Sequence, residues 1–180
     1  MNEPHLLPSW AEDLRRRYLR GEASMFVLHG NVYDVVVHGP QTSSLVDFLT
    51  DVLLKDTRES IAVYNMATGP RFAKRAAGAG GLDDVLGETQ KDKVLPALER
   101  LLVGSMRAAV ILEYAESLAP AGDPTFQSDG DRSAIIMLHR WSSLPAIEKG
   151  DNIILLIAEN LSYLAPKIVS NPKVAVVDVP

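Results

Sequence analysis

A series of short, uninterrupted apolar runs, separated by segments with helical periodicity, constrains the fold most strongly. Five runs of this kind occupy residues 25–29, 60–67, 107–113, 152–158 and 173–179. Continuous apolar runs are typical of strands buried on both faces, whereas half-exposed strands alternate apolar and polar residues. The intervening segments place apolar residues three and four positions apart, as amphipathic helices do. This alternation predicts an α/β domain of three layers, with a five-stranded parallel sheet between helices.

The helices between these strands are predicted from apolar spacing and from their end signals. In the second helix, Ser44 and Asp47 resemble a capping box. Pro96 falls within the third pattern and is tolerated if that helix begins just before it. The glycine-rich stretch 69–81 carries Arg71, Lys74 and Arg75 and predicts a flexible surface loop, with a binding loop for phosphate or nucleic acid as the alternative. The expected helices span residues 10–20, 43–55, 89–103, 131–141 and 161–169.

The composition excludes several classes of protein. The chain has 180 residues, of which 47% are hydrophobic, which is enough for one domain core. A net charge of -5 gives no support for nucleic-acid binding. The absence of cysteine excludes a disulfide scaffold, thiolate metal sites and a cysteine nucleophile. The first residues do not resemble a signal peptide, and the longest apolar run, 153–158, is too short to span a bilayer. We therefore expect a cytoplasmic protein without a membrane partner.

The residues that follow each strand are the first place to look for a binding site, because ligands bind at the carboxyl ends of strands in open parallel sheets. Glu113 and Glu116 follow the third strand, and Asn160 follows the fourth. Glu113 is a candidate magnesium ligand or a hydrogen-bonded residue at the end of a strand. Asn160 is a candidate for orienting a water molecule or for capping the next helix. The catalytic candidates are therefore Glu113, Glu116 and Asn160, with Glu113 the only candidate metal ligand.

Three segments in succession carry recognisable motifs. AVILEYAES, residues 109–117, looks like a Walker B strand, and IILLIAENLSYLAPKIV, residues 153–169, is similar to a sensor 1 segment. With KVAVVDVP, residues 173–180, as a final core strand, the three segments resemble the core of AAA+ ATPases. The resemblance implies a P-loop NTPase-like core over residues 23–180, with strand order 5-1-4-3-2, after a helical lead-in over residues 1–22. It also implies ATP and magnesium as the cofactors of the wider family.

The segment that should bind phosphate departs from this pattern. A G-x-x-x-x-G-K-[ST] loop should join the first strand to the second helix. The chain instead has GNVYDVVVHGPQTS at residues 30–43, without a lysine and rich in valine, which predicts a hairpin-like extension. The acidic pair of Walker B is replaced by Glu113 and Tyr114. We therefore expect no bound cofactor and no measurable ATP affinity. The remaining vestiges of a nucleotide site are Gly30, Asn31, Thr42 and Ser43.

The resemblance implies a degenerate AAA+ module that serves assembly or regulation. Because the family continues into a helical lid where this sequence reaches Pro180, we expect a non-catalytic N-terminal piece of a larger ATP-binding protein. One alternative is a divergent Mg²⁺-ATPase that uses Glu113 and Glu116. Another is a binding module of receiver or flavodoxin type, although a receiver needs acidic residues after its first strand.

The expected partners are other AAA+ modules or subunits, in a head-to-tail homo-oligomer of the longer protein. Two surfaces of opposite charge suggest this arrangement. Helix 10–20 carries Arg15, Arg16 and Arg17, whereas loop 117–130 leads into the acidic Asp129-Gly130-Asp131. Opposite charges on separate surfaces suit repeated contacts between subunits.

Overall fold

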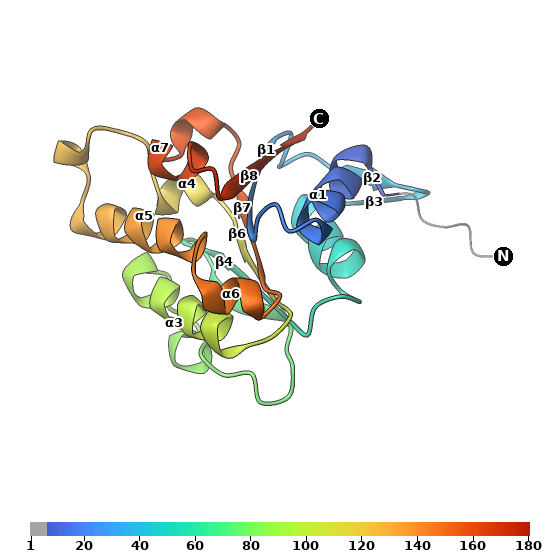
Figure 1. The fold of residues 1–180 in the computed structure, drawn as a ribbon, viewed down its shortest axis with the longest axis horizontal. Coiled ribbons are helices and arrows are strands. Elements are labelled where there is room, and N and C mark those ends of the chain that lie inside the picture. The colour runs from blue at the N-terminus through green and yellow to red at the C-terminus, as the bar shows by residue number, and fades with distance from the viewer. Residues whose placement is uncertain (1–6) are drawn as a thin grey trace.

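The computed structural model describes residues 7–180, so part of the predicted lead-in, residues 1–6, lies outside the described residues. A six-stranded sheet lies between two layers of helices (Figure 1). Its strands follow the order β5-β4-β6-β7-β1-β8. They are β1 (Met25–Gly30), β4 (Ser60–Asn65), β5 (Gly69–Lys74), β6 (Ala108–Leu112), β7 (Ile153–Ile157) and β8 (Val174–Val179).

Five of these strands are parallel and lie in the succession β8-β1-β7-β6-β4, which is the succession that the sequence predicts for them. The prediction of a five-stranded, wholly parallel sheet is nevertheless wrong at one edge, where β5 runs antiparallel to β4. The predicted flexible loop 69–81 therefore begins as a strand. Gly69, at φ +77°, lets the chain reverse directly after β4, and a Cβ there would stand 2.6 Å from the Glu88 carbonyl oxygen.

The two faces of the sheet are covered by separate groups of helices. One face packs against α3 (Lys91–Gly104) and α5 (Asp129–Trp141), with the shorter α4 (Ala115–Leu118), α6 (Pro145–Lys149) and α7 (Pro166–Val169). The other packs against α1 (Ser9–Leu19) and α2 (Leu45–Phe48), which continues as a π-helical turn, Leu49–Leu53. Trp10 and Leu14 of α1 are buried in that second core, so the lead-in helix shares a core with the sheet. The domain division at residue 22 itself stays a prediction.

Three helices differ from the sequence prediction. The helix expected over residues 161–169 is divided into a 3-10 turn, Leu161–Tyr163, and α7 (Pro166–Val169). The helix expected over residues 43–55 is shorter and turns from α to π after Phe48. The helix α3 begins at Lys91, so Pro96 lies well inside it rather than at its start. Proline leaves the carbonyl four residues earlier without its helical donor, and that carbonyl belongs to Asp92, an exposed residue that water reaches. No helix within residues 7–180 combines the length and the apolar character needed to cross a bilayer.

The segment between β1 and α2 forms the predicted hairpin. Its strands β2 (Val36–His38) and β3 (Gln41–Ser43) pair antiparallel outside the main sheet. Figure 1 shows this hairpin projecting past α1, away from the sheet. The chain therefore leaves the end of β1 and returns at the start of α2 without forming a compact loop between them.

Candidate functional site

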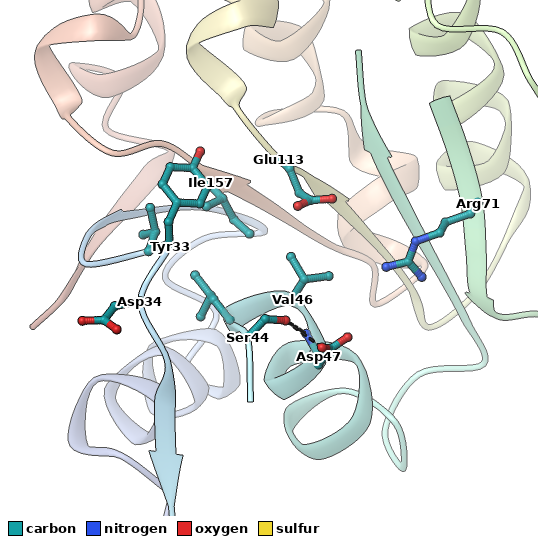
Figure 2. A pocket seen from close by; sticks show the side chains of 10 residues that line it. Tyr33, Asp34, Ser44, Val46, Asp47, Arg71, Glu113 and Ile157 are labelled. Carbon is teal, nitrogen blue, oxygen red and sulfur yellow. Dashed lines mark hydrogen bonds between the residues drawn. The ribbon is translucent and has the colours of Figure 1, made fainter. Parts of the chain in front are cut away.

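A cavity of about 270 Å³ opens at the carboxyl end of the parallel strands (Figure 2). It lies between the turn after β1, the start of α2, the end of β6 and the edge strand β5. Figure 2 shows the Glu113 carboxylate facing Val46 across this space, with Arg71 reaching in from β5. The lining residues are Val32, Tyr33, Asp34, Ser44, Leu45, Val46, Asp47, Arg71, Glu113 and Ile157.

The backbone N–H groups that follow β1 are already used by the chain. The Gly30 N–H donates to the carbonyl of Glu159 at 3.2 Å, and the Asn31 N–H donates to the carbonyl of Val179 at 2.8 Å. Gly30 has φ +100°, and a Cβ there would stand 2.5 Å from the Val179 oxygen. This glycine is therefore required for the close approach of β8. Its N–H and that of Asn31 do not point freely toward a ligand.

The start of α2 is likewise occupied. Ser44 accepts the Asp47 N–H at 3.1 Å and donates its hydroxyl to the Asp47 carboxylate at 2.8 Å. A helix N-terminus binds anions through free N–H groups and its dipole, and here the Ser44 side chain already bonds one of those N–H groups. Thr42 and Ser43 lie in β3 of the hairpin, where the Ser43 hydroxyl is 3.4 Å from the His38 ring. The candidates Thr42 and Ser43 are therefore not brought to the helix terminus.

Glu113 is half-buried and accepts a hydrogen bond from the Asn65 amide at 3.1 Å. Asn65 in turn accepts the N–H groups of Ala67 and Thr68, both at 2.9 Å, and so holds the turn that leads to β5. This arrangement is the one expected of a hydrogen-bonded residue at the end of a strand. Within residues 7–180, no three acidic or histidine side chains come together as a metal site.

Asn160 lies outside the cavity and caps a short helix. Its side-chain oxygen accepts the N–H and the hydroxyl of Ser162, both at 2.9 Å, at the start of the 3-10 turn Leu161–Tyr163. The side chain is exposed. The structure thus agrees with the helix-cap interpretation of Asn160 and does not bring it together with Glu113.

Two tyrosines that the sequence does not single out as a pair stack beside the cavity. The ring centroids of Tyr33 and Tyr114 are 4.9 Å apart with an interplanar angle of 18°. Tyr114 has φ +51°, an uncommon conformation for a bulky residue. Burial raises the pKa of the Tyr33 hydroxyl, and the negative charges of Glu116, Glu113 and Glu159 raise it further. Tyr33 therefore lies within electrostatic reach of three carboxylates.

Glu116 has a side chain that the rest of the chain does not fully satisfy. Its Oε2 atom is buried, and among residues 7–180 it has no hydrogen-bond partner. Glu116 lies in the first turn of α4, directly after β6 and Tyr114. The only basic side chain lining the cavity described above is Arg71, which belongs to the stretch 69–81 that the sequence predicts as a basic, flexible loop.

A family profile described as "AAA+ chaperone, N-terminal Rossmann-like domain" matches residues 2–180. The chain belongs to this family. No curated protein matches the chain. The Rossmann-like description agrees with a three-layer domain and a mostly parallel sheet. It favours the AAA+ resemblance over the receiver or flavodoxin alternative.

In this AAA+ chaperone N-terminal domain, the structure gathers only part of the predicted site. Glu113 lines the cavity, and Glu116 follows it three residues later in α4. The N–H groups of Gly30 and Asn31, in contrast, donate to backbone carbonyls. The tyrosines were missed because their contact joins two distant segments and leaves no spacing signal in the sequence. What the site retains is therefore a set of acidic and aromatic groups without a cradle for phosphate.

Proposed function

We propose that this domain is a non-catalytic module of a larger AAA+ chaperone that binds no nucleotide and serves assembly or regulation. One observation carries the proposal: the groups that should cradle phosphate are occupied by the chain itself. The N–H groups of Gly30 and Asn31 bond carbonyls, and the start of α2 is capped by Ser44 and Asp47. The strand succession β8-β1-β7-β6-β4 supports a P-loop NTPase-like origin for the sheet.

The charge around the cavity supports the same proposal. Three carboxylates, those of Asp34, Asp47 and Glu113, line it against the single guanidinium of Arg71. A triphosphate is stabilised by cations and by aligned N–H donors, and it is repelled by carboxylates. Because no lysine lies in residues 30–43, nothing in this segment offsets that repulsion.

The second candidate function is a divergent Mg²⁺-ATPase that uses Glu113 and Glu116. It is less well supported, since Glu113 already accepts from Asn65 and the adjacent position, where the family has a catalytic acid, holds Tyr114. A tyrosine stacked on Tyr33 does not act as a carboxylate base. For the main candidate function, we also propose a cytoplasmic location.

Calorimetry with Mg²⁺ and ATP tests the main proposal directly. We expect no measurable binding to residues 1–180. Binding tighter than about 10 μM, or roughly 7 kcal/mol, would overturn it. The Glu113→Gln variant is the matched control, because any binding that depends on a metal at Glu113 is lost when that carboxylate is replaced by an amide.

We also propose that the partners are AAA+ subunits in a head-to-tail assembly, but the structure weakens the charge argument for its surfaces. Arg15 and Arg16 pair with Glu12 and Asp13 on the same helix. Arg17 donates to the Val176 carbonyl at 2.8 Å and so covers the open edge of β8.

The acidic surface is also paired internally. Asp129 contacts Arg132, and Asp131 bonds the largely buried Lys91. The appropriate test therefore reverses only Arg15 and Arg16 to Glu, leaving Arg17 in place, and follows assembly of the parent protein by light scattering. Unchanged assembly would show that this part of α1 does not contribute to the contact surface.

A further inference from the structure

The stacked tyrosines and the acids around them form a surface that the fold itself does not require. We define the tyrosine–glutamate surface as Tyr33, Tyr114, Glu113, Glu116 and Glu159. The two tyrosines are 47% and 45% exposed, so solvent reaches both rings of the stacked pair. A half-exposed aromatic pair offers a flat face with negative charge above it, and that face attracts cations.

The carboxylates around the pair strengthen this preference. Glu116, Glu113 and Glu159 all act on the Tyr33 hydroxyl through their negative charge. A carboxylate only accepts hydrogen bonds, so this surface calls for a donor that is also a cation. Arg71 approaches Glu113 from β5, on the cavity side, and is the one counter-charge lining the cavity.

Glu116 also has one acceptor that the described part of the chain leaves unpaired. Oε2 of Glu116 is buried and unpaired within the described part of the chain. Buried acceptors in folded proteins nearly always have a donor, and one left without a partner costs free energy. Among the charged side chains, Glu116 contributes most to the raised pKa of the Tyr33 hydroxyl, so its carboxylate belongs to the same surface as the aromatic pair.

We propose that the tyrosine–glutamate surface binds an arginine side chain presented by a partner polypeptide. The planar guanidinium stacks on an aromatic ring and donates several hydrogen bonds in one plane, so it satisfies the ring faces and the carboxylates together. Lysine offers the charge without the stacking plane. The inference rests on the proposed function, because the same edge of the sheet must be free of nucleotide for a partner side chain to reach it.

Backbone amide NMR of residues 1–180 tests this inference with a defined probe. The probe is a capped glycine–serine peptide carrying three arginines, and the control peptide carries citrulline, a neutral isostere, at the same positions. We expect saturable shifts at Tyr114 and Glu116 with the arginine peptide only. Equal binding of the citrulline peptide, or shifts confined to other parts of the domain, would overturn the inference.

Two isosteric variants separate this surface from general charge attraction. Glu116→Gln removes the unpaired carboxylate, whereas Glu148→Gln makes the same change at an exposed glutamate of α6. We expect Glu116→Gln to weaken the peptide about five-fold and Glu148→Gln to leave it unchanged. Equal weakening by both would contradict the inference, and a thermal unfolding curve checks that each variant is folded.

Nucleotide and nucleoside titrations distinguish a failure of the proposed function from a failure of this inference. Saturable shifts with Mg²⁺ and ATP overturn the proposed function and the inference with it. Binding of adenosine, without binding of the arginine peptide, overturns only the inference, because it assigns the aromatic pair to a base. Failure of all three ligands contradicts only the inference.

Discussion

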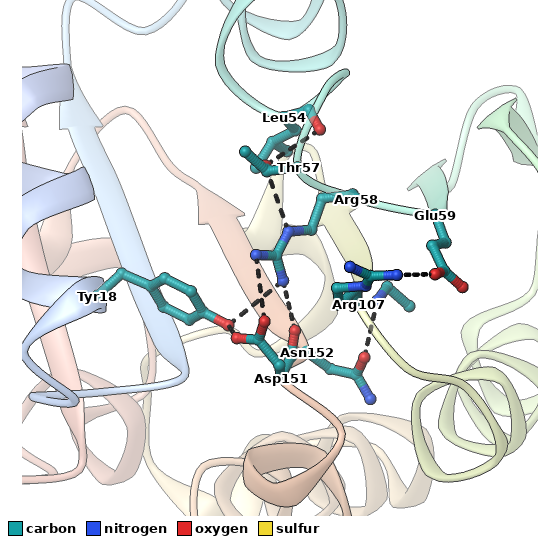
Figure 3. A network of polar contacts seen from close by, with 9 residues as sticks. Tyr18, Leu54, Thr57, Arg58, Glu59, Arg107, Asp151 and Asn152 are labelled. Carbon is teal, nitrogen blue, oxygen red and sulfur yellow. Dashed lines mark hydrogen bonds and ion pairs between the residues drawn. The ribbon is translucent and has the colours of Figure 1, made fainter.

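Polar groups at the two ends of the parallel strands differ in how fully they are hydrogen-bonded within the chain. At the amino ends, Arg58 is buried and bonds the hydroxyl of Tyr18 and the carbonyl of Asp151 (Figure 3). At the carboxyl ends, the rings of Tyr33 and Tyr114 are half-exposed, and Oε2 of Glu116 has no partner within residues 7–180. The first end uses its polar groups for internal bonding, and the second leaves one carboxylate oxygen unpaired and two rings half-exposed.

Asn152 shows how completely the amino ends are satisfied. Its fully buried side chain accepts the Ala108 N–H at 2.7 Å and donates to the carbonyls of Leu102 and Ser105 at 2.7 and 2.8 Å. It therefore ties the start of β7 to β6 and to the end of α3. The polar groups at the amino ends therefore contribute more to stability than those at the carboxyl ends, so substitutions at the two ends should have different effects on the free energy of unfolding.

The largest effect is expected for Asn152→Ala. This change leaves one buried N–H and two carbonyls without partners, and we expect a loss of about 3 kcal/mol in the free energy of unfolding. Urea denaturation measures it. Asn160→Ala, which removes only an exposed helix cap, should cost about 1 kcal/mol. Equal costs would remove the distinction between the two ends.

Arg58→Ala should follow, with a loss of about 2 kcal/mol. It removes a buried guanidinium that holds Asp151 and Tyr18 together and leaves the Asp151 carbonyl without this donor. The same denaturation experiment on Arg20→Ala, an exposed arginine of the same region, should show a change within about 0.5 kcal/mol. A cost for Arg58→Ala as small as that would mean that solvent replaces its contacts.

The Tyr18 hydroxyl adds a dependence on pH. Burial, together with its hydrogen bond to Asp151, raises the pKa of Tyr18 to about 12, from about 10 in an unfolded chain. The folded state therefore holds this proton more tightly, and the resulting stability is complete below pH 10 and lost as the pH rises toward 12.

Stability measured across this window tests the Tyr18 assignment. Tyr18→Phe should lose stability less steeply between about pH 10 and 12 than the unchanged chain. Part of the slope remains, because the pKa values of Tyr33 and Tyr64 are also raised. Tyr163→Phe, at an exposed tyrosine, is the control that should keep the full slope. Identical slopes for Tyr18→Phe and the unchanged chain would contradict the assignment.

The smallest effect on stability is expected at the carboxyl ends. Glu116→Gln should not lower the free energy of unfolding by more than about 0.5 kcal/mol, since Oε2 makes no hydrogen bond within residues 7–180 that the change could break. Thermal unfolding measures this change. A cost comparable to that of Arg58→Ala would show that Glu116 has a structural partner and would weaken its role in recognition.

The sequence predicts the arrangement of the parallel sheet well because burial on both faces leaves a strong pattern. The run 153–158 is apolar throughout, and β7 is indeed central, between β6 and β1. The edge strand β5 leaves no such pattern, because its outward positions, among them Arg71, are polar and glycines follow it. Strands at an edge are therefore the part of this fold that apolar periodicity misses.

The sequence predicts where the candidate site lies, but only some of the residues that form it. The rule that ligands bind at the carboxyl ends of strands led to Glu113 and Glu116, and the missing lysine was visible directly. The contact of Tyr33 with Tyr114 depends on how the turn after β1 folds back over β6. Such a contact between distant segments leaves no spacing in one sequence, and neither do the bonds of Asn152.

The most direct test of the central claim follows the backbone amides of Gly30, Asn31 and Ser44 by NMR while Mg²⁺ and ATP are added. The first two N–H groups donate to carbonyls of the chain, and Ser44 caps α2. A carboxyl edge without a phosphate cradle predicts that these three signals do not move at millimolar ATP. Saturable shifts at all three, lost in Glu113→Gln, would show that the edge binds nucleotide and would contradict the claim.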